Sequence, residues 1–173
     1  NGFIVTTRGL RDVRSQQQDI VIVSSSWAPE TYNSAPLHGA LLRWARAGTT
    51  MGALDTGAFI LAEAGLLKGH RVTTHYEHID SLKELYPDTD VSEDLFVYDG
   101  KRITCCGGIA SADFALHIIR SMQGDSLANA TARYLFHHNL RPQGTSQNPG
   151  SVEPLGSTAP TVLKRAIKLM EEN

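Results

Sequence analysis

Residues 51–65, MGALDTGAFILAEAG, constrain the fold more than any other part of the chain. An apolar segment runs into a tight turn at residues 54–57 and continues as a helical run over residues 58–64. A strand that leads directly into a helix thrusts one side chain up at the corner, and Asp55 holds that position. In a parallel sheet, this corner lies where ligands collect and where helix amides favour negative charge.

Asp55 has two interpretations. An aspartate before a helix often serves only as a cap. A nucleophile elbow, in contrast, carries Ser or Cys, and acyl transfer needs a hydroxyl or thiol with a base beside it. The second interpretation is therefore a degenerate active site that has become a binding pocket, and the sequence leaves both open.

Size and charge set the limits for the rest of the chain. With 173 residues, 41% of them apolar, the chain fits one domain with a three-layer core and an appended segment. No membrane span or secretory signal is visible in the sequence. A net charge of -2 and a pI near 6.4 leave no electrostatic footprint for nucleic acid. The cysteines are the neighbours Cys105 and Cys106, which favours no disulfide and a cytoplasmic location.

The first half of the chain alternates between strand and helix patterns. Residues 19–23 form an apolar run that we expect to be a strand buried on both faces, and the loop that follows, residues 24–29, is a second candidate wall for the crevice. A helix is predicted over residues 37–47 and a strand over 49–54. The short β-branched run at 3–7 is also typical of a strand. This alternation predicts an α/β fold with a parallel sheet.

The second half continues the pattern and then changes composition. We expect a strand at 70–75 that ends near the elbow, a hairpin turning at the Asp-Gly of residues 98–101, and a helix over 109–122. Further helices are predicted over residues 79–86, from 125 to about 140, and over 161–172. Between the last two, residues 141–160 are rich in Pro, Gly, Ser and Gln, which is typical of a linker.

Three motifs in this order resemble a known family. They are LDTGAFILAEAGLL at 54–67, TTHYE at 73–77 and TCCGG at 104–108, followed by Asp113 and His117. They resemble the sensor domain of AraC-type transcriptional regulators, which has the ThiJ/PfpI, class I glutamine-amidotransferase-like fold, and most of all the subgroup with Asp-Thr-Gly at the elbow. The resemblance covers roughly residues 19–140, and residues 160–171 resemble the first helix of the family's DNA-binding domain.

The resemblance implies a flavodoxin-like α/β fold: a mostly parallel sheet with helices on both faces, a three-layer sandwich. Residues 1–142 would form the sensor domain without the family's first strand-helix unit, and 143–160 the linker. Residues 161–173 would begin the helix-turn-helix domain, whose remainder is absent from this sequence. We therefore expect a fragment of a longer regulator.

The implied function is to sense a small effector, to form a homodimer and to act on DNA through a C-terminal domain outside this chain. No catalysis, cofactor, metal or membrane partner is expected. Effectors in the subgroup are amino-acid-like or quaternary-amine metabolites, for which carboxylates would supply charge and aromatic rings would supply faces for a cation. The expected ligand-binding residues are Asp55, Thr56, His75, Glu77, Trp27 and Tyr76.

Each candidate also has an ordinary structural interpretation. Trp27 fits a loop aromatic packed over the sheet edge, and His75 fits a hydrogen bond to a neighbouring backbone group or carboxylate. Cys106, placed before two glycines, fits either a redox sensor or a buried inert thiol. Two carboxylates in one crevice repel unless a cation lies between them, and Arg71 is an internal alternative to a ligand cation. The histidines at 117, 137 and 138 have no metal-binding pattern around them.

The sequence is also compatible with two other functions. One is an amidase or hydrolase of the same fold that uses Cys106 or Asp55 with His75. The other is a structural dimerisation module without a ligand.

Overall fold

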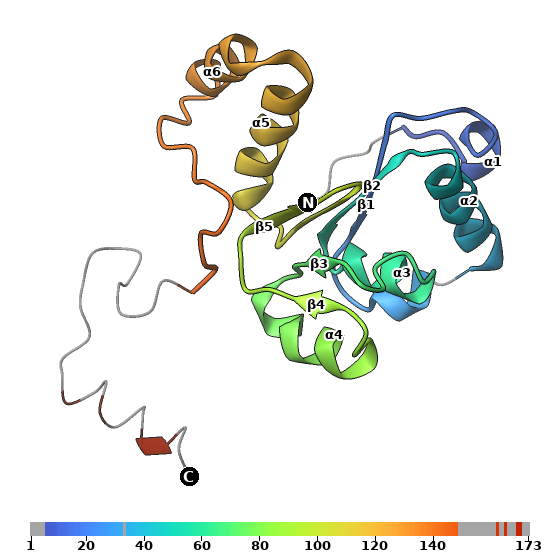
Figure 1. Ribbon diagram of the computed structural model, residues 1–173, viewed down its shortest axis with the longest axis horizontal. Coiled ribbons are helices and arrows are strands. Elements are labelled where there is room, and N and C mark those ends of the chain that lie inside the picture. The colour runs from blue at the N-terminus through green and yellow to red at the C-terminus, as the bar shows by residue number, and fades with distance from the viewer. Residues whose placement is uncertain (1–5, 33, 149–161, 163–164, 166–168, 171–173) are drawn as a thin grey trace.

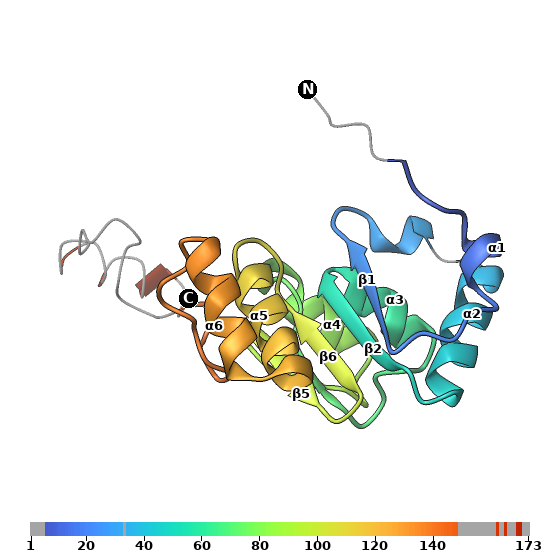
Figure 2. The ribbon, with the colours of Figure 1, turned by 90° about the horizontal axis from the view of Figure 1, so that it is seen from above.

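The computed structural model describes residues 6–32, 34–148, 162, 165, 169 and 170. The central sheet has four strands in the order β1-β2-β6-β5. Their bounds are β1 (Ile20–Ser25), β2 (Thr50–Asp55), β5 (Phe96–Asp99) and β6 (Arg102–Cys105). The first three in this order run parallel, and β5 pairs antiparallel with β6 through the predicted Asp-Gly turn, where Gly100 has a φ of 57°. Figure 2 shows β1, β2 and β6 side by side.

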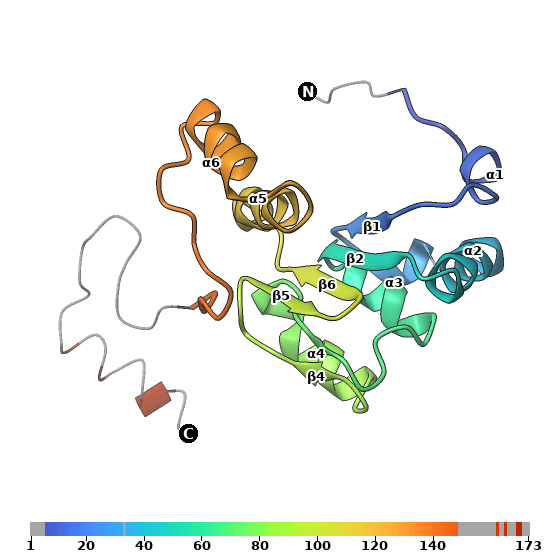
Figure 3. The same ribbon diagram turned by 45° about the horizontal axis from the view of Figure 1, so that its top comes forward.

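Helices cover both faces of this sheet (Figure 3). They are α2 (Ala35–Arg46) and α3 (Gly57–Glu63) on one face and α5 (Ala110–Gln123) on the other, with α6 (Asp125–Tyr134) packed on α5. Leu41 and Met51 are among the buried residues of the core under α2 and α3, and Phe96 and Phe114 belong to the core under α5. The predicted three-layer, flavodoxin-like α/β fold is confirmed.

A smaller parallel pair, β3 (Arg71–Val72) and β4 (Asp90–Val91), lies beside the main sheet with the 3-10 turn η2 (Tyr76–His78) and helix α4 (Ile79–Leu85) (Figure 1). The strand predicted at 70–75 is therefore shorter than expected. It stops because the Thr73 N–H donates to the Thr104 hydroxyl at 2.8 Å instead of a strand carbonyl. The segment nevertheless reaches the elbow, where the Thr74 hydroxyl donates to the carbonyl of Asp55 at 2.9 Å.

One expectation about β1 is wrong. This strand is not buried on both faces, because Ile22 is 41% exposed and Ser24 is exposed too. The reason is positional: β1 ends the described sheet on one side, and the core under α5 is centred on β5 and β6. Val21 and Val23 face the other way and pack on the core under α2 and α3.

Some helix boundaries also differ from the prediction. The chain adds a short α1 (Leu10–Val13) and a 3-10 turn η1 (Pro29–Tyr32) that the sequence pattern did not indicate. Helix α6 ends at Tyr134 rather than near residue 140, and Phe136 then takes a φ of 54°, outside the right-handed helical region. Most of the β-branched run at 3–7 and of the helix predicted at 161–172 lies outside the described residues.

The first part of the predicted linker packs on the domain. The Leu95 N–H donates to the Thr145 carbonyl at 2.7 Å, and the Gln147 N–H donates to the Glu93 carbonyl at 2.8 Å. Asp94 and Ser146 form an antiparallel bridge between these two bonds. Residues 145–147 therefore behave as a short added strand although their composition is that of a linker.

Within the described part of the chain, no helix is both long and apolar enough to cross a membrane.

Candidate functional site

The corner after β2 has the geometry of a nucleophile elbow. Asp55 takes a φ of 57°, a left-handed conformation that is uncommon outside glycine. Helix α3 follows at once, and a Cβ on Gly57 would lie 2.2 Å from the Val23 carbonyl oxygen. On the opposite side, a Cβ on Gly107, whose φ is 89°, would lie 3.0 Å from the Cβ of Asp55. The two glycines allow β1 and the β6-α5 turn to close in on the corner.

The carboxylate of Asp55 is not used to hold the fold. Thr56, not Asp55, is the N-cap residue of α3, and that helix start has no side-chain cap hydrogen bond. Among the described residues, the Asp55 carboxylate has no hydrogen bond or ion pair, whereas its backbone carbonyl accepts the Thr74 hydroxyl. The interpretation of Asp55 as a helix cap is therefore wrong.

Two hollows meet at Asp55. The larger has a volume of about 430 Å³ and opens between the ends of β1, β2 and the β6-α5 turn. Its lining is Ser24, Ser25, Ser26, Tyr32, Leu54, Asp55, Gly107, Gly108 and Ser111. The smaller, of about 130 Å³, is lined by Ser26, Trp27, Asp55, His75, Glu77 and His78. Both lie at carboxyl ends of strands, as expected for this class of fold.

The structure brings four of the six predicted residues together. Trp27, His75 and Glu77 line the smaller hollow with Asp55, and Trp27 is 79% exposed. Thr56 lines neither hollow, because it is fully buried and its hydroxyl donates to the Ser26 carbonyl. Tyr76 does not line them either; it is 61% exposed, and its ring centre lies 4.5 Å from that of His75.

Sequence reasoning missed several lining residues. The serines at 24–26 belong to the loop that was expected to form a wall of the crevice, but none of them was named as a binding residue. The Oγ atom of Ser25 is buried without a hydrogen-bond partner among the described residues. Ser111 enters from the first turn of α5, and His78 from the end of η2. Their positions in the sequence could have identified them, because each of these residues follows or ends a segment that stops at the same rim of the sheet.

The imidazole of His75 is engaged by Glu77. Its Nδ1 accepts the Glu77 N–H at 3.4 Å and lies 3.7 Å from the Glu77 carboxylate. This arrangement agrees with the structural interpretation of His75. Arg71 does not neutralise the crevice, since its guanidinium contacts Ser92 at 3.2 Å and Asp94 at 3.4 Å.

The two thiols behind the elbow are both buried and free. The hydrogen bond that Cys106 donates to Cys105, together with burial, raises the pKa of Cys106 far above its ordinary value. The same hydrogen bond lowers the pKa of Cys105, which has no exposed surface. A redox-sensing thiol combines low pKa with accessibility, and neither cysteine has both.

A second carboxylate in α5 has the opposite environment. Asp113 is fully buried, with His137 Nε2 at 2.7 Å from one oxygen and Arg141 Nη2 at 2.6 Å from the other. The Arg141 N–H also donates to it at 2.9 Å. Burial alone raises the pKa of Asp113, but the hydrogen bonds from His137 and Arg141 and the arginine charge together hold it below its ordinary value.

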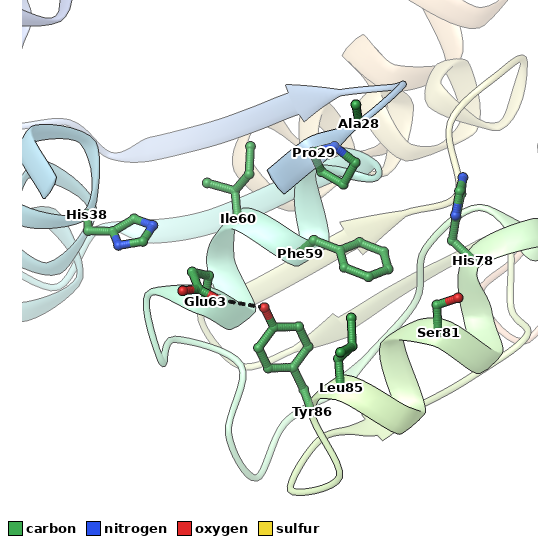
Figure 4. Close-up of a pocket in the computed structure, with 10 residues that line it drawn as sticks. All are labelled: Ala28, Pro29, His38, Phe59, Ile60, Glu63, His78, Ser81, Leu85 and Tyr86. Atoms are coloured by element: carbon green, nitrogen blue, oxygen red, sulfur yellow. Dashed lines mark hydrogen bonds between the residues drawn. The ribbon is translucent and has the colours of Figure 1, made fainter. Parts of the chain in front are cut away.

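A separate apolar pocket of about 490 Å³ lies between η1, α2, α3 and α4 (Figure 4). Phe59 packs edge-on against Tyr86 with ring centres 6.4 Å apart, and the Tyr86 hydroxyl donates to Glu63 at 2.8 Å. Burial and this hydrogen bond raise the pKa of Tyr86 to about 12, so its proton is held. The carboxylate in this pocket is therefore already hydrogen-bonded, unlike that of Asp55.

No group of three or more metal-ligating side chains occurs among the described residues.

Comparison with known proteins identifies the fold and the domain type. Residues 3–121 match the DJ-1/PfpI family. The chain is 37% identical over 147 residues to the HTH-type transcriptional regulator CdhR of Pseudomonas aeruginosa, a match that covers 85% of this chain and 44% of CdhR. The chain thus spans less than half the length of that regulator.

A solved structure and an enzyme are also similar. The crystal structure of an AraC family transcriptional regulator from Pseudomonas putida superposes with a TM-score of 0.65 at 25% identity, covering 77% of this chain and 70% of that one. The glutathione-independent glyoxalase DJR-1.2 of Caenorhabditis elegans is 29% identical over 76% of this chain and 70% of the enzyme. The resemblance to regulator sensor domains is confirmed, and the chain belongs to the DJ-1/PfpI family.

Proposed function

We propose that the chain is the effector-sensing domain of an AraC-type transcriptional regulator and that it binds a cationic or zwitterionic small molecule beside Asp55. The observation that carries the proposal is the unpaired Asp55 carboxylate, which projects from an elbow between two hollows. The similarity to CdhR and to the Pseudomonas putida regulator supports the regulatory role.

The chemistry around Asp55 favours a positively charged group. The Glu77 carboxylate lines the same hollow, and two carboxylates in one crevice repel unless a cation lies between them. Arg71 is engaged elsewhere, so the described residues supply no arginine to this position. The exposed indole of Trp27 offers a ring face that suits a quaternary amine.

The elbow does not support the amidase or hydrolase alternative. Asp55 replaces the hydroxyl or thiol that acyl transfer needs, and His75 is engaged with Glu77. Cys106 is buried with a raised pKa, which disfavours the thiolate. A turnover signal with amide or ester substrates that disappears in His75→Ala or Cys106→Ala would overturn the non-enzymatic proposal.

Binding is tested by calorimetry with the amino acids and with tetramethylammonium as a minimal quaternary cation. For the compound that binds, Asp55→Asn should weaken binding by about 1.5 to 3 kcal/mol, the range for hydrogen bonds to charged groups. Asp80→Asn is the matched control, because that carboxylate is fully exposed on α4. Equal affinity in wild type and Asp55→Asn would remove Asp55 from the site.

The remaining parts of the function are also proposals. The sensor would form a homodimer, because paired half-sites in DNA match two-fold protein symmetry, and it would act in the cytoplasm through a C-terminal DNA-binding domain. Light scattering at tens of micromolar tests the dimer, and a monomer at that concentration would count against it.

A further inference from the structure

Residues 135–148 follow α6 and form the exit segment of the domain. Hydrogen bonds through two buried threonines link this exit segment to the elbow at Asp55. Thr73 and Thr74 are both fully buried. The Thr74 hydroxyl donates to the Asp55 carbonyl at 2.9 Å, and the Thr74 carbonyl accepts the side-chain amide of Gln147 at 2.9 Å. One residue thus contacts the elbow on one side and the exit segment on the other.

Gln147 holds the exit segment at this point. Its side-chain nitrogen also lies 2.9 Å from the Thr73 hydroxyl and 3.1 Å from the Asp94 carbonyl. These three acceptors share the two protons of one neutral amide. The backbone bonds between residues 93–95 and 145–147 continue the same attachment.

The exit segment has a second, much stronger attachment nearer α6. There the Asp113 carboxylate, fully buried, is bound by Arg141 and His137. Hydrogen bonds between charged groups exceed those between neutral groups in strength, so the Gln147 attachment is the one that gives way first. Residues 145–147 are therefore held less strongly than Arg141.

We infer that Gln147 is the coupling residue of this sensor. Residues 145–147 dock on residues 93–95 or are released from them according to the position of the elbow, and Thr74 links the elbow to Gln147. The inference rests on the proposed function, since it assumes that an effector beside Asp55 moves the elbow. Gln147 would pass the change on toward the predicted C-terminal helix, because the chain continues from Gln147 in that direction.

The coupling can be measured without an effector, by amide hydrogen exchange on the chain as it stands. The amides of Leu95 and Gln147 report docking, because each donates across the 93–95 and 145–147 contact. Thr74→Val removes the hydroxyl that contacts Asp55 and leaves the Thr74 carbonyl that contacts Gln147. We expect exchange at the two reporter amides to rise about fivefold, the effect of one neutral hydrogen bond.

Thr49→Val is the matched control. Thr49 is also buried, and its hydroxyl also donates to a backbone carbonyl, that of Gln18, but it lies just before the other end of β2. A general loss of stability would affect both variants alike, whereas coupling raises exchange at Leu95 and Gln147 only in Thr74→Val. Equal exchange in the two variants at these amides overturns the inference.

Coupling must also act in the reverse direction, because linkage is reciprocal. Gln147→Ala should raise exchange at the Thr56 amide, which donates to the Ser25 carbonyl at the elbow. The control is Gln16→Ala, which removes a side-chain amide that donates to the Asp12 carbonyl on an exposed surface. An unchanged Thr56 amide in Gln147→Ala overturns the inference. Failure of effector binding at Asp55 would leave both exchange results intact, so the two proposals fail separately.

Discussion

Two aspartates in this molecule have opposite surroundings. Asp55 has a left-handed backbone conformation, with Gly57 two residues after it and Gly107 packed against its side chain. The Asp55 carboxylate has no hydrogen-bond or ion-pair partner among the described residues. Asp113 sits inside α5, is fully buried, and is bound by His137 and Arg141. The elbow thus depends on the close approach of backbone segments at two glycines, whereas the Asp113 cluster depends on ion pairs.

The difference separates a carboxylate that holds the fold from one that is available to a ligand. A buried charge must be neutralised within the protein, so the partners of Asp113 are structural. A carboxylate that is left unpaired beside a hollow is free to accept a ligand's positive group. Substitutions that disturb the elbow and substitutions that disturb the Asp113 cluster should therefore change the free energy of unfolding by different amounts.

The largest effect is expected where the elbow is most crowded. In Gly57→Ala, the new Cβ would meet the Val23 carbonyl oxygen at 2.2 Å, so β1 or α3 must move. We expect a loss of about 3 kcal/mol or more in the free energy of unfolding, measured with denaturant. The control is Gly39→Ala in α2, where the Cβ would approach only the Arg43 side chain at 3.8 Å and stability should rise slightly. Similar stabilities in the two variants would show that shape does not define the elbow.

The next largest effect is expected at the charged cluster. Arg141→Ala leaves Asp113 buried with fewer partners, and we expect a loss of about 2 to 3 kcal/mol. This lies below the loss for a fully buried pair because the Arg141 side chain is 35% exposed. Arg120→Ala, which breaks an exposed pair with Asp125, should cost less than about 1 kcal/mol. Thermal unfolding of the two variants distinguishes them, and equal losses would contradict the structural role of Asp113.

The pH dependence of stability gives a smaller and more specific test. The folded-state pKa of Asp113 lies below its value in the unfolded chain, so its stabilising contribution is complete above the unfolded pKa, near 3.9. The contribution is lost as the pH falls through the folded pKa. The stability advantage of wild type over Asp113→Asn should therefore shrink as the pH decreases from about 5. An advantage that stays constant or grows on acidification would contradict this assignment.

The smallest effect is expected at Asp55 itself. Asp55→Gly removes the carboxylate and relieves the left-handed conformation, but it adds flexibility to the unfolded chain. We expect a net change of less than about 1 kcal/mol, in the stabilising direction. Asp55→Val, which places a β-branched residue at a φ of 57°, should be destabilising. Chemical denaturation measures both, and a large loss in Asp55→Gly would show that the carboxylate holds the fold.

Local patterns predicted most of the architecture. The Asp-Thr-Gly turn before an apolar helical run predicted the elbow, and the Asp-Gly turn predicted the hairpin between β5 and β6. Both succeed because the turn and its flanking elements lie within a few residues of each other. The strand at 71–72 was predicted too long, since the Thr73 amide is claimed by the side chain of Thr104, 31 residues away.

The candidate site was predicted only in part. Trp27, Asp55, His75 and Glu77 meet at one hollow, as their places at strand ends indicated. Tyr76 and Thr56 immediately follow two of these residues but line neither hollow, because neighbours in an irregular segment point in different directions. The loop at 24–29 was expected to form a wall of the crevice, and its serines at 24–26 line the larger hollow, although nothing in the local pattern marked any one of them as a binding residue.

The sequence by itself determined the alternation of the main strands and helices, the parallel α/β class and the corner at Asp55, because each depends on periodicity or on glycine within a short window. Only the tertiary structure decided that Asp113 is neutralised by residues 24 and 28 positions away, and that Gln147 contacts Thr74 across 73 positions. These contacts follow from how the packed layers bring distant backbone together. A polar residue in a linker-like composition carries no local sign of the partner that it will meet.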